Sequence, residues 1–214
     1  MIHKDGLPWI ITPAIAGVTA LLSKKKKLAL SFMGLAAFNT YFFRDPPREA
    51  VLNPELIISP ADGKVVKCEV EERRDWYQGP LWRIGIFMRL WDVHINRSPV
   101  IGKILKMSYF KGEKQPVFRE EAFSKNEKQV YLIEREDGIP VWVIQIAGAI
   151  ARRIKTFVLP GDDLVAGDPI GIIRFGSRVE VFFPAEDAEV YVKEGHRVFA
   201  GETVIARLPL KTKK

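Results

Sequence analysis

Ten short β-rich runs, separated by glycine, proline and aspartate, fill most of the chain after residue 44 and constrain its fold more than any other feature. Many short strands at this spacing favour an antiparallel sandwich or barrel over a parallel sheet with helical crossovers. We expect a mainly β protein with minor α, whose β-sandwich or barrel-sandwich-like core spans residues 49–214. Helix is expected only near residues 118–123 and at the N-terminus. The predicted strands are residues 64–70, 81–88, 101–110, 130–134, 141–145, 154–159, 170–175, 178–183, 188–192 and 203–208.

Two apolar runs of 16 residues, at 7–22 and 28–43, precede this core and are separated by Ser23 and four lysines at 24–27. As a helix each run would extend about 24 Å, less than the roughly 30 Å hydrocarbon core of a bilayer. A signal peptide carries its positive charges ahead of a single apolar stretch, so we do not expect a signal peptidase to remove this segment. Residues 1–48 are predicted to form N-terminal apolar membrane helices. They could form a hairpin dipping into one leaflet, with the lysines reaching the phosphates, or one span beside an interfacial run. A buried pair of soluble helices is the remaining alternative.

Most of the net charge of +7 lies in this N-terminal segment, which contains seven basic residues and two acidic ones. Basic residues beside apolar runs favour an anionic membrane surface, so we expect no nucleic-acid partner. The single cysteine, Cys68, excludes an intrachain disulfide and a cysteine-rich metal site. Neither metal-ligand spacing nor a glycine-rich phosphate loop occurs in the sequence, and we predict no metal.

A faint repeat links residues 158–168 with residues 192–202, since both follow a Gly-x-x-x-x-Ala-Gly-acidic pattern. Each copy predicts a strand, a turn and a strand, with glycines that allow positive φ. The pattern is similar to biotinyl and lipoyl carrier domains. Those domains present a modified lysine between hydrophobic residues, whereas Lys193 lies beside a Glu-Gly step. We therefore interpret this likeness as architectural.

Gly176 and Ser177 stand between two runs that alternate apolar and polar residues. Alternation of period two predicts strand on either side, which places the Gly-Ser step at a bend or bulge. Taken alone, the step favours a simple turn with a solvated hydroxyl over a functional site.

Four stretches in a fixed order give this serine its context. They are Phe-Phe-Arg-Asp-Pro at 42–46, Ser-Pro-Ala-Asp-Gly-Lys-Val at 59–65, Trp-Asp-Val-His-Ile-Asn-Arg-Ser-Pro at 91–99 and Phe-Gly-Ser at 175–177. Asn-Glu-Lys at 126–128 and Gln-Ile-Ala-Gly at 145–148, followed by Ala-Arg-Arg-Ile at 151–154, belong to the same set. Together they resemble the phosphatidylserine decarboxylase proenzymes in their short form, over nearly the whole chain.

The resemblance implies self-processing. The Ser177 hydroxyl would attack the Gly176 carbonyl to form an ester, and β-elimination would cleave the chain into residues 1–176 and 177–214, which stay together. Loss of ammonia would leave a pyruvoyl group derived from Ser177, the covalent cofactor of the family. This group would form a Schiff base with phosphatidylserine and accept electrons as CO2 leaves, giving phosphatidylethanolamine.

The resemblance also implies roles for other residues. His94 matches the histidine motif and is the candidate proton donor in decarboxylation. Asp62 matches the aspartate that works with the serine in self-cleavage. Long-form enzymes carry a second histidine three residues after the first, where this chain has Arg97. Either His94 serves both steps, or Asp62 activates Ser177 with less help, while Arg97 binds a lipid phosphate or carboxylate. The small residue that usually follows the serine is replaced by Arg178.

The resemblance thus implies a pyruvoyl-dependent carboxy-lyase that acts on phosphatidylserine in an anionic membrane. From the basic, apolar N-terminus we expect the protein at the cell membrane with its catalytic domain on the cytoplasmic side, and by analogy with the family we expect a homodimer. A decarboxylase of an ether-linked serine lipid is a close alternative. The alternative from another class is a non-catalytic, membrane-anchored module like the biotinyl and lipoyl β-barrels, which predicts an uncut chain and indifference to Ser177→Ala.

Overall fold

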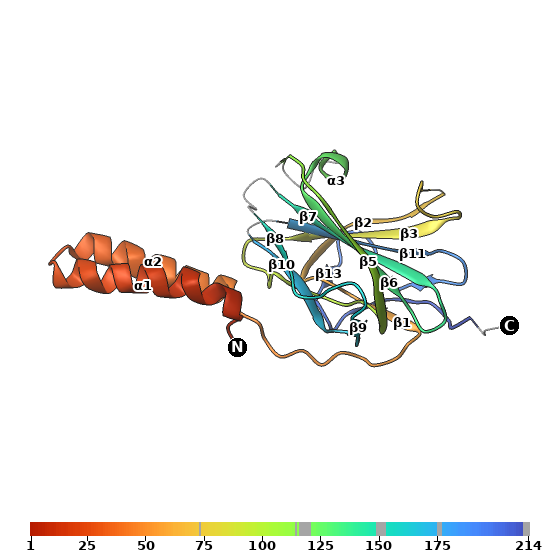
Figure 1. The fold of residues 1–214 in the computed structure, drawn as a ribbon, viewed down its shortest axis with the longest axis horizontal. Helices are drawn as coiled ribbons and strands as arrows, with labels where there is room; N and C mark the ends of the chain where they lie inside the picture. The colour runs from red at the N-terminus through yellow and green to blue at the C-terminus, as the bar shows by residue number, and fades with distance from the viewer. Residues whose placement is uncertain (73, 114, 116–120, 149–152, 175–176, 212–214) are drawn as a thin grey trace. The chain divides into compact units, whose positions relative to one another are not determined.

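The computed structural model describes the whole chain except residues 73, 114, 116–120, 149–152, 175–176 and 212–214. Its contacts divide the chain into two compact units. One comprises Met1–Pro47 and Trp91–Val93, and the other comprises Arg48–Leu90 and His94–Lys214. The larger unit is mainly β and the smaller is mainly helical (Figure 1), which confirms the predicted fold class.

The smaller unit contains a hairpin of two helices, α1 (Leu7–Leu22) and α2 (Lys26–Phe42), preceded by the 3-10 turn η1 (Lys4–Gly6). Small residues dominate the buried positions of α1, where Gly17 packs so closely that a Cβ would lie 3.0 Å from the sulfur of Met33. Asn39 donates a hydrogen bond from Nδ2 to the Trp9 carbonyl at 2.6 Å. Close approach over small residues with an interhelical polar contact is typical of helix packing in membranes.

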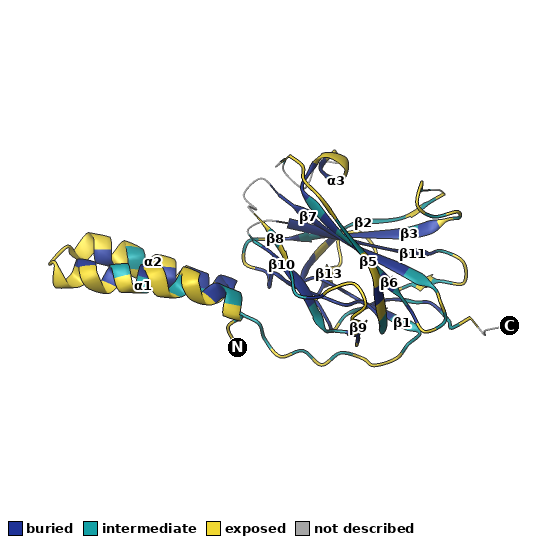
Figure 2. Cartoon of the chain, in the orientation of Figure 1, coloured by how far each residue is buried: buried dark blue, intermediate teal, exposed yellow. Residues whose placement is uncertain are grey.

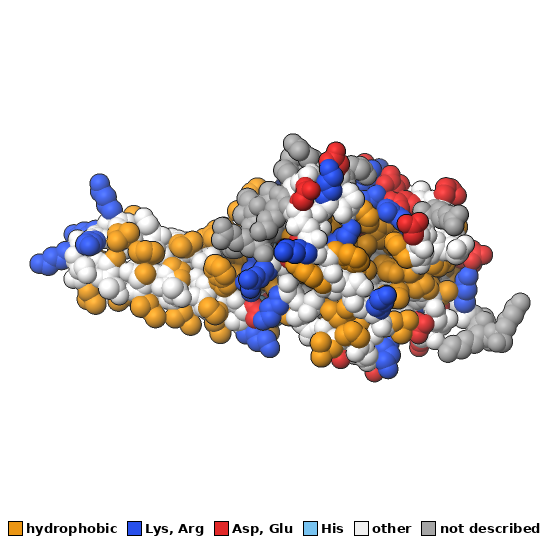
Figure 3. All heavy atoms as spheres, turned by 45° about the horizontal axis from the view of Figure 1, so that its top comes forward, with side chains coloured by type: hydrophobic (Ala, Val, Ile, Leu, Met, Phe, Trp, Pro, Cys, Tyr) orange, Lys and Arg blue, Asp and Glu red, His pale blue; other side chains and the backbone are white. Residues whose placement is uncertain are grey.

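Much of the outside of the hairpin is exposed (Figure 2), and hydrophobic side chains are distributed along its length (Figure 3). Residues 4–22 form a stretch long and apolar enough to cross a membrane. The four lysines at 24–27 lie where the chain reverses between the helices, at the end of the hairpin. The exposed large apolar residues of the two helices are Leu7, Trp9, Ile11, Ile15, Val18, Leu21, Leu22, Leu28, Leu30, Met33, Leu35, Phe38 and Tyr41.

The larger unit is organised by a curled antiparallel sheet in the order β13-β2-β3-β11-β7-β6-β5-β9. Two three-stranded sheets, β1-β14-β12 and β4-β10-β8, complete it. The short helix α3 (Ala122–Lys125) lies in the connection between β5 and β6. The strands are β1 (Leu56–Ile58), β2 (Gly63–Glu71), β3 (Leu81–Met88), β4 (Ile95–Arg97), β5 (Gly102–Phe110), β6 (Lys128–Glu134), β7 (Pro140–Ala147), β8 (Ile154–Thr156), β9 (Asp163–Leu164), β10 (Pro169–Ile173), β11 (Ser177–Pro184), β12 (Glu189–Val190), β13 (Arg197–Val198) and β14 (Val204–Arg207).

Successive side chains of the central strands point to opposite faces of the large sheet, so each strand contributes to two apolar clusters. On β11, Val179, Val181 and Phe183 face the main core, which the smaller sheets cover. Phe182, on the opposite face, packs with Trp142 of β7 in a second apolar cluster. Both faces of β11 are buried, because every residue of this strand is shielded from solvent.

The expected strands occur, but several boundaries differ. The strand expected at 154–159 ends at Thr156, and the one expected at 188–192 has only two paired residues. Four short strands, β1, β4, β9 and β13, were not predicted. The helix expected at 118–123 is described only from residue 122 onward, and its earlier part lies outside the described residues.

The glycines of the two C-terminal repeats have the predicted backbone conformation. Gly161 and Gly195 occupy matching positions with φ of 98° and 96°, and Gly167 and Gly201 match with φ of 91° and 78°. A side chain at these angles would strain the turn, so each repeat requires glycine at both places.

Candidate functional site

Ser177 is the first residue of β11, the strand that lies between β3 and β7 in the large sheet. It pairs with Met88 on one side and Ala147 on the other, and it is completely buried. Its hydroxyl donates to the Met88 sulfur at 3.2 Å. A thioether is a weak acceptor, so this contact holds the hydroxyl only lightly. Gly176, the other half of the predicted cleavage site, lies outside the described residues.

A network of buried polar side chains is hydrogen-bonded to the Met88 sulfur. Asn96 donates from Nδ2 to the Met88 sulfur at 3.6 Å and accepts from Gln145 Nε2 at 2.7 Å. Tyr131 donates its hydroxyl to Gln145 Oε1 at 2.7 Å. Burial raises the pKa of Tyr131, which keeps this hydroxyl protonated as a donor. A Cβ at Gly171 would lie 2.8 Å from the Tyr131 oxygen, so the network needs a residue without a side chain there.

Asp62, just before β2, is held by groups that sequence reasoning did not identify. Arg48 donates from Nη2 to both carboxylate oxygens, at 3.1 and 2.9 Å, and from Nη1 to Glu202 at 2.9 Å. The Ala200 backbone N–H donates to Asp62 Oδ1 at 2.8 Å. Charged donors to a buried carboxylate favour its ionised form, so this arrangement suits a general base or an orienting anion.

The start of β2 and the start of β11 are related by strand register. Lys64 pairs with Phe87, and the next residue of β3, Met88, pairs with Ser177. Neighbouring strands lie about 4.8 Å apart, so the backbone near Asp62 is about two spacings, or roughly 10 Å, from Ser177. Two side chains with one intervening group can bridge such a separation.

The motif that contains His94 and Arg97 lies against the loop that carries Asp62. His94 is 1% exposed and directly precedes β4. The Pro60 carbonyl accepts a hydrogen bond from the Arg97 backbone N–H at 2.9 Å and from Asn96 Nδ2 at 3.5 Å. Residues two apart in an extended strand share a face, so we expect the His94 imidazole on the side of Asn96.

The Arg97 side chain is also largely buried. Its Nη1 donates to the Gly167 carbonyl at 2.9 Å. A Cβ at Gly201 would approach its Cδ to 3.1 Å and the Cβ of Arg48 to 3.4 Å, so Gly201 lies between the two arginines. Anion binding by Arg97 remains a prediction.

The structure thus brings the serine, the aspartate loop and the histidine motif to one end of the central strands. Asn96 and Gln145 belong to motifs that the sequence singled out without assigning them a role. Met88 and Arg48 carried no sequence signal that links them to the site, because their partners lie far away in the chain.

The fold and the site together place the chain in the class of mainly β proteins that bury a serine at the first residue of a central strand, with a buried carboxylate on the loop before β2. Residues 35–206 match the family model described as phosphatidylserine decarboxylase. A phosphatidylserine decarboxylase proenzyme of Desulfotalea psychrophila is 35% identical over 97% of this chain and 96% of its own length. The proenzyme of the same name from Geobacter metallireducens is 39% identical over 97% of each chain.

A third relative comes from an archaeon. A protein of Methanopyrus kandleri, provisionally named an archaetidylserine decarboxylase proenzyme, is 38% identical over 92% of this chain and 95% of its own length. The chain belongs to the phosphatidylserine decarboxylase family.

Proposed function

We propose that this chain is a self-processing, pyruvoyl-dependent phosphatidylserine decarboxylase attached to a membrane. The observation that carries the proposal is the position of Ser177, buried at the first residue of a central strand in a chain of this family. The Asp62 loop and the His94 motif lie near the same strand ends.

In the first reaction, the Ser177 hydroxyl attacks the Gly176 carbonyl and an ester replaces the peptide bond. A hydroxyl is a weak nucleophile and needs a base, for which Asp62 and His94 are the candidates. The weak sulfur contact means that little hydrogen-bond energy opposes the movement of the hydroxyl toward the carbonyl. Elimination then breaks the ester and separates residues 1–176 from residues 177–214.

The two products are expected to remain one folded unit. Residues 177–214 contain β11 to β14, and β11 pairs with β3 over eight residues and with β7 over six. β13 pairs with β2, and β14 pairs with β1. Hydrogen bonds between strands and packing in the core therefore hold the two products together after the bond between residues 176 and 177 is broken.

The residues around Ser177 suit a small, uncharged group at the new N-terminus. The position is fully buried and pairs with Met88 and Ala147, and the Met88 sulfur contacts both the Ser177 hydroxyl and the Asn96 amide. A pyruvoyl group there would supply the electron sink for loss of the substrate carboxylate. His94 would deliver the proton to the substrate carbon, and the Tyr131–Gln145–Asn96 network would fix the wall of the site.

The helical hairpin supports attachment to a membrane, because large apolar side chains cover its outside. Entry of the lysine-bearing end into the hydrocarbon would cost about 2.5–3.5 kcal/mol for each lysine on insertion scales. We therefore propose that the hairpin lies along the interface, with the lysines among anionic headgroups. Anionic lipids are typical of the cytoplasmic leaflet, so we place the catalytic unit on that side.

Intact mass spectrometry of the purified protein tests the processing step. We expect two fragments, the smaller lighter by one ammonia than residues 177–214, and a single uncut chain for Ser177→Ala. Ser98→Ala is the matched control, because Ser98 is also fully buried and donates its hydroxyl to a backbone carbonyl. It should still cleave. An uncut wild-type chain that is folded would refute self-processing.

The archaeal relative supports a second candidate substrate, an ether-linked serine lipid. Purified, cleaved protein would be supplied with ester-linked and ether-linked phosphatidylserine in matched vesicles. Faster CO2 release from the ether-linked lipid would favour this substrate over the ester-linked one.

A further inference from the structure

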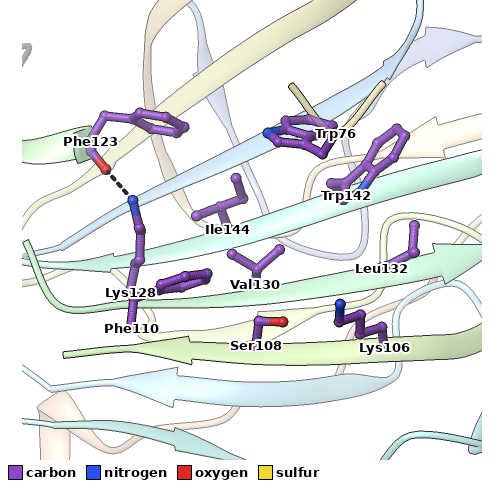
Figure 4. Close-up of a pocket in the computed structure, with 10 residues that line it drawn as sticks. All are labelled: Trp76, Lys106, Ser108, Phe110, Phe123, Lys128, Val130, Leu132, Trp142 and Ile144. Carbon is purple, nitrogen blue, oxygen red and sulfur yellow. Dashed lines mark hydrogen bonds between the residues drawn. The ribbon is translucent and has the colours of Figure 1, made fainter. Parts of the chain in front are cut away.

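A cavity lies on the face of the large sheet opposite to the one that carries Ser177 and Val179. Its volume is about 490 Å³, and β5, β6 and β7 form its floor (Figure 4). Val130, Leu132 and Ile144 lie on the floor, whereas Ser177 faces the main core with Val179. This cavity is therefore separate from the candidate active site.

Aromatic rings line much of the cavity. Trp76 and Trp142 pack in a tilted arrangement with ring centroids 4.5 Å apart, and Phe110 and Phe123 lie toward the other end (Figure 4). A cavity of a few hundred Å³ with apolar and aromatic walls and few polar groups is typical of small-molecule sites.

Two polar groups on the wall have no partner within the described part of the chain. Lys106 and Ser108 are two residues apart on β5, and the side chain of neither makes a hydrogen bond or ion pair with a described residue. The second lysine of the cavity, Lys128, is different, since it donates to the carbonyls of Phe123 at 3.1 Å and Ser124 at 3.5 Å. The available cation and hydroxyl are thus at the Lys106 end.

The charge around the cavity is positive overall. Arg74 and Arg83 lie over the Phe123 ring at 4.8 and 4.7 Å. Burial, followed by the charge of Arg74, lowers the pKa of Lys128. Three carboxylates, Glu69, Glu71 and Glu180, pair with the arginines of this face, and with Arg74, Arg83, Arg178, Lys106 and Lys128 the cations still outnumber them. An anionic ligand would meet a favourable field, whereas a cationic one would not.

We propose that this cavity binds a single-chain anionic amphiphile. The carboxylate or phosphate of the ligand accepts hydrogen bonds from Lys106 and Ser108, and its alkyl chain lies over Val130 and Ile144 toward Phe110. Lys106 and Phe110 are four residues apart on β5, about 13 Å at the usual rise of a strand, which suits a chain of medium length.

Tryptophan fluorescence tests the proposal, because Trp76 and Trp142 line the cavity. The probe is ω-bromoundecanoate, whose bromine quenches indoles at close contact, and its neutral analogue is ω-bromoundecanol. The full chain would carry Trp9→Phe and Trp91→Phe, which remove the tryptophans of the helical unit, and Trp82→Phe, because Trp82 packs against the main core and does not line the cavity. We expect saturable quenching by the acid.

Variants then locate the ligand. Lys106→Gln should weaken binding of the acid by about fivefold to tenfold and leave binding of the alcohol unchanged. Lys103→Gln is the matched control, since Lys103 is an exposed lysine of the same strand that does not line the cavity. Ser108→Phe should place a ring across the proposed path of the alkyl chain, between Lys106 and Phe110, and should strongly reduce quenching by both probes, with the circular dichroism spectrum confirming that the variant folds.

Several results would overturn the proposal. Equal affinities of Lys106→Gln and Lys103→Gln for the acid would remove the role of the cation. Quenching that persists in Ser108→Phe would place the chain elsewhere, for example on the apolar helices. Absence of quenching in a protein that sediments as a dimer, and becomes monomeric on Ser108→Phe, would show that a second copy covers this face.

Discussion

Replacement of Arg48 by methionine should destabilise the protein by about 3 kcal/mol. Both partners of the Arg48–Asp62 pair are nearly buried, with side chains 9% and 6% exposed. Removal of one member of a buried ion pair costs about 3–5 kcal/mol, because the other charge loses its compensation. The Ala200 N–H remains on Asp62 at 2.8 Å and offsets part of this loss, which places the estimate at the lower end.

Urea unfolding in the Ser177→Ala background measures this effect, since an uncut chain gives a defined unfolding equilibrium. A double-mutant cycle of Arg48→Met with Asp62→Asn isolates the coupling between the two side chains. The control is Arg207→Met, which breaks an ion pair with Glu55 whose side chains are 43% and 30% exposed. This exposed pair should contribute less than about 1 kcal/mol.

The reasoning would be refuted by a coupling between Arg48 and Asp62 no larger than that of the exposed control pair. When Ser177 is retained, so that the chain can cleave itself, the Arg48→Met substitution also has a functional consequence. If Arg48 positions Asp62 for self-cleavage, Arg48→Met should slow the appearance of the 177–214 fragment, whereas Arg207→Met should leave that rate unchanged.

Three further outcomes follow from single features. Burial raises the pKa of Tyr131 in the folded state, so its contribution to stability is complete below about pH 10, the unfolded value, and is lost as pH rises further. The fall in thermal midpoint above that pH should shrink in Tyr131→Phe, and an unchanged fall would assign it to other groups. Gly201→Ala should cost about 1 kcal/mol or more at its φ of 78°, whereas Gly34→Ala, with open space inside α2, should stabilise by up to about 1 kcal/mol. Stabilisation by both substitutions would contradict the backbone argument. Glutamine at all four positions 24–27 should weaken binding to anionic vesicles by about 1 kcal/mol per lysine, with little change on zwitterionic vesicles. Equal loss on both would show that charge does not drive the attachment.

Local patterns in the sequence predicted much of the fold because each has a local cause. Alternation after Ser177 places every second side chain of β11 on the main core, and the structure agrees. The two apolar runs form the expected helices, with α1 spanning residues 7–22 as predicted. The repeat glycines take positive φ because the turns demand it.

The features that the sequence did not predict depend on contacts between distant residues. Arg48 and Asp62 are 14 positions apart, and Met88 lies 89 positions before Ser177. β4 and β13 have only three and two residues, too few for periodicity to be recognised. The cavity over β5, β6 and β7 needs three strands in register and the Trp76 segment, so no single stretch of sequence encodes it.

The position of Ser177 meets two opposing requirements of the proposed processing reaction. Attack on the preceding carbonyl requires the backbone around residues 176 and 177 to change geometry, which a residue in the middle of a strand paired on both sides could not do without breaking ladder hydrogen bonds. Integrity after cleavage requires that the smaller chain be held firmly. A serine at the first paired position of β11 satisfies both, because the bond to be cut precedes the strand while the paired residues that follow hold the product between β3 and β7. A serine moved further into β11 would thus be expected to cleave poorly even with the same neighbours.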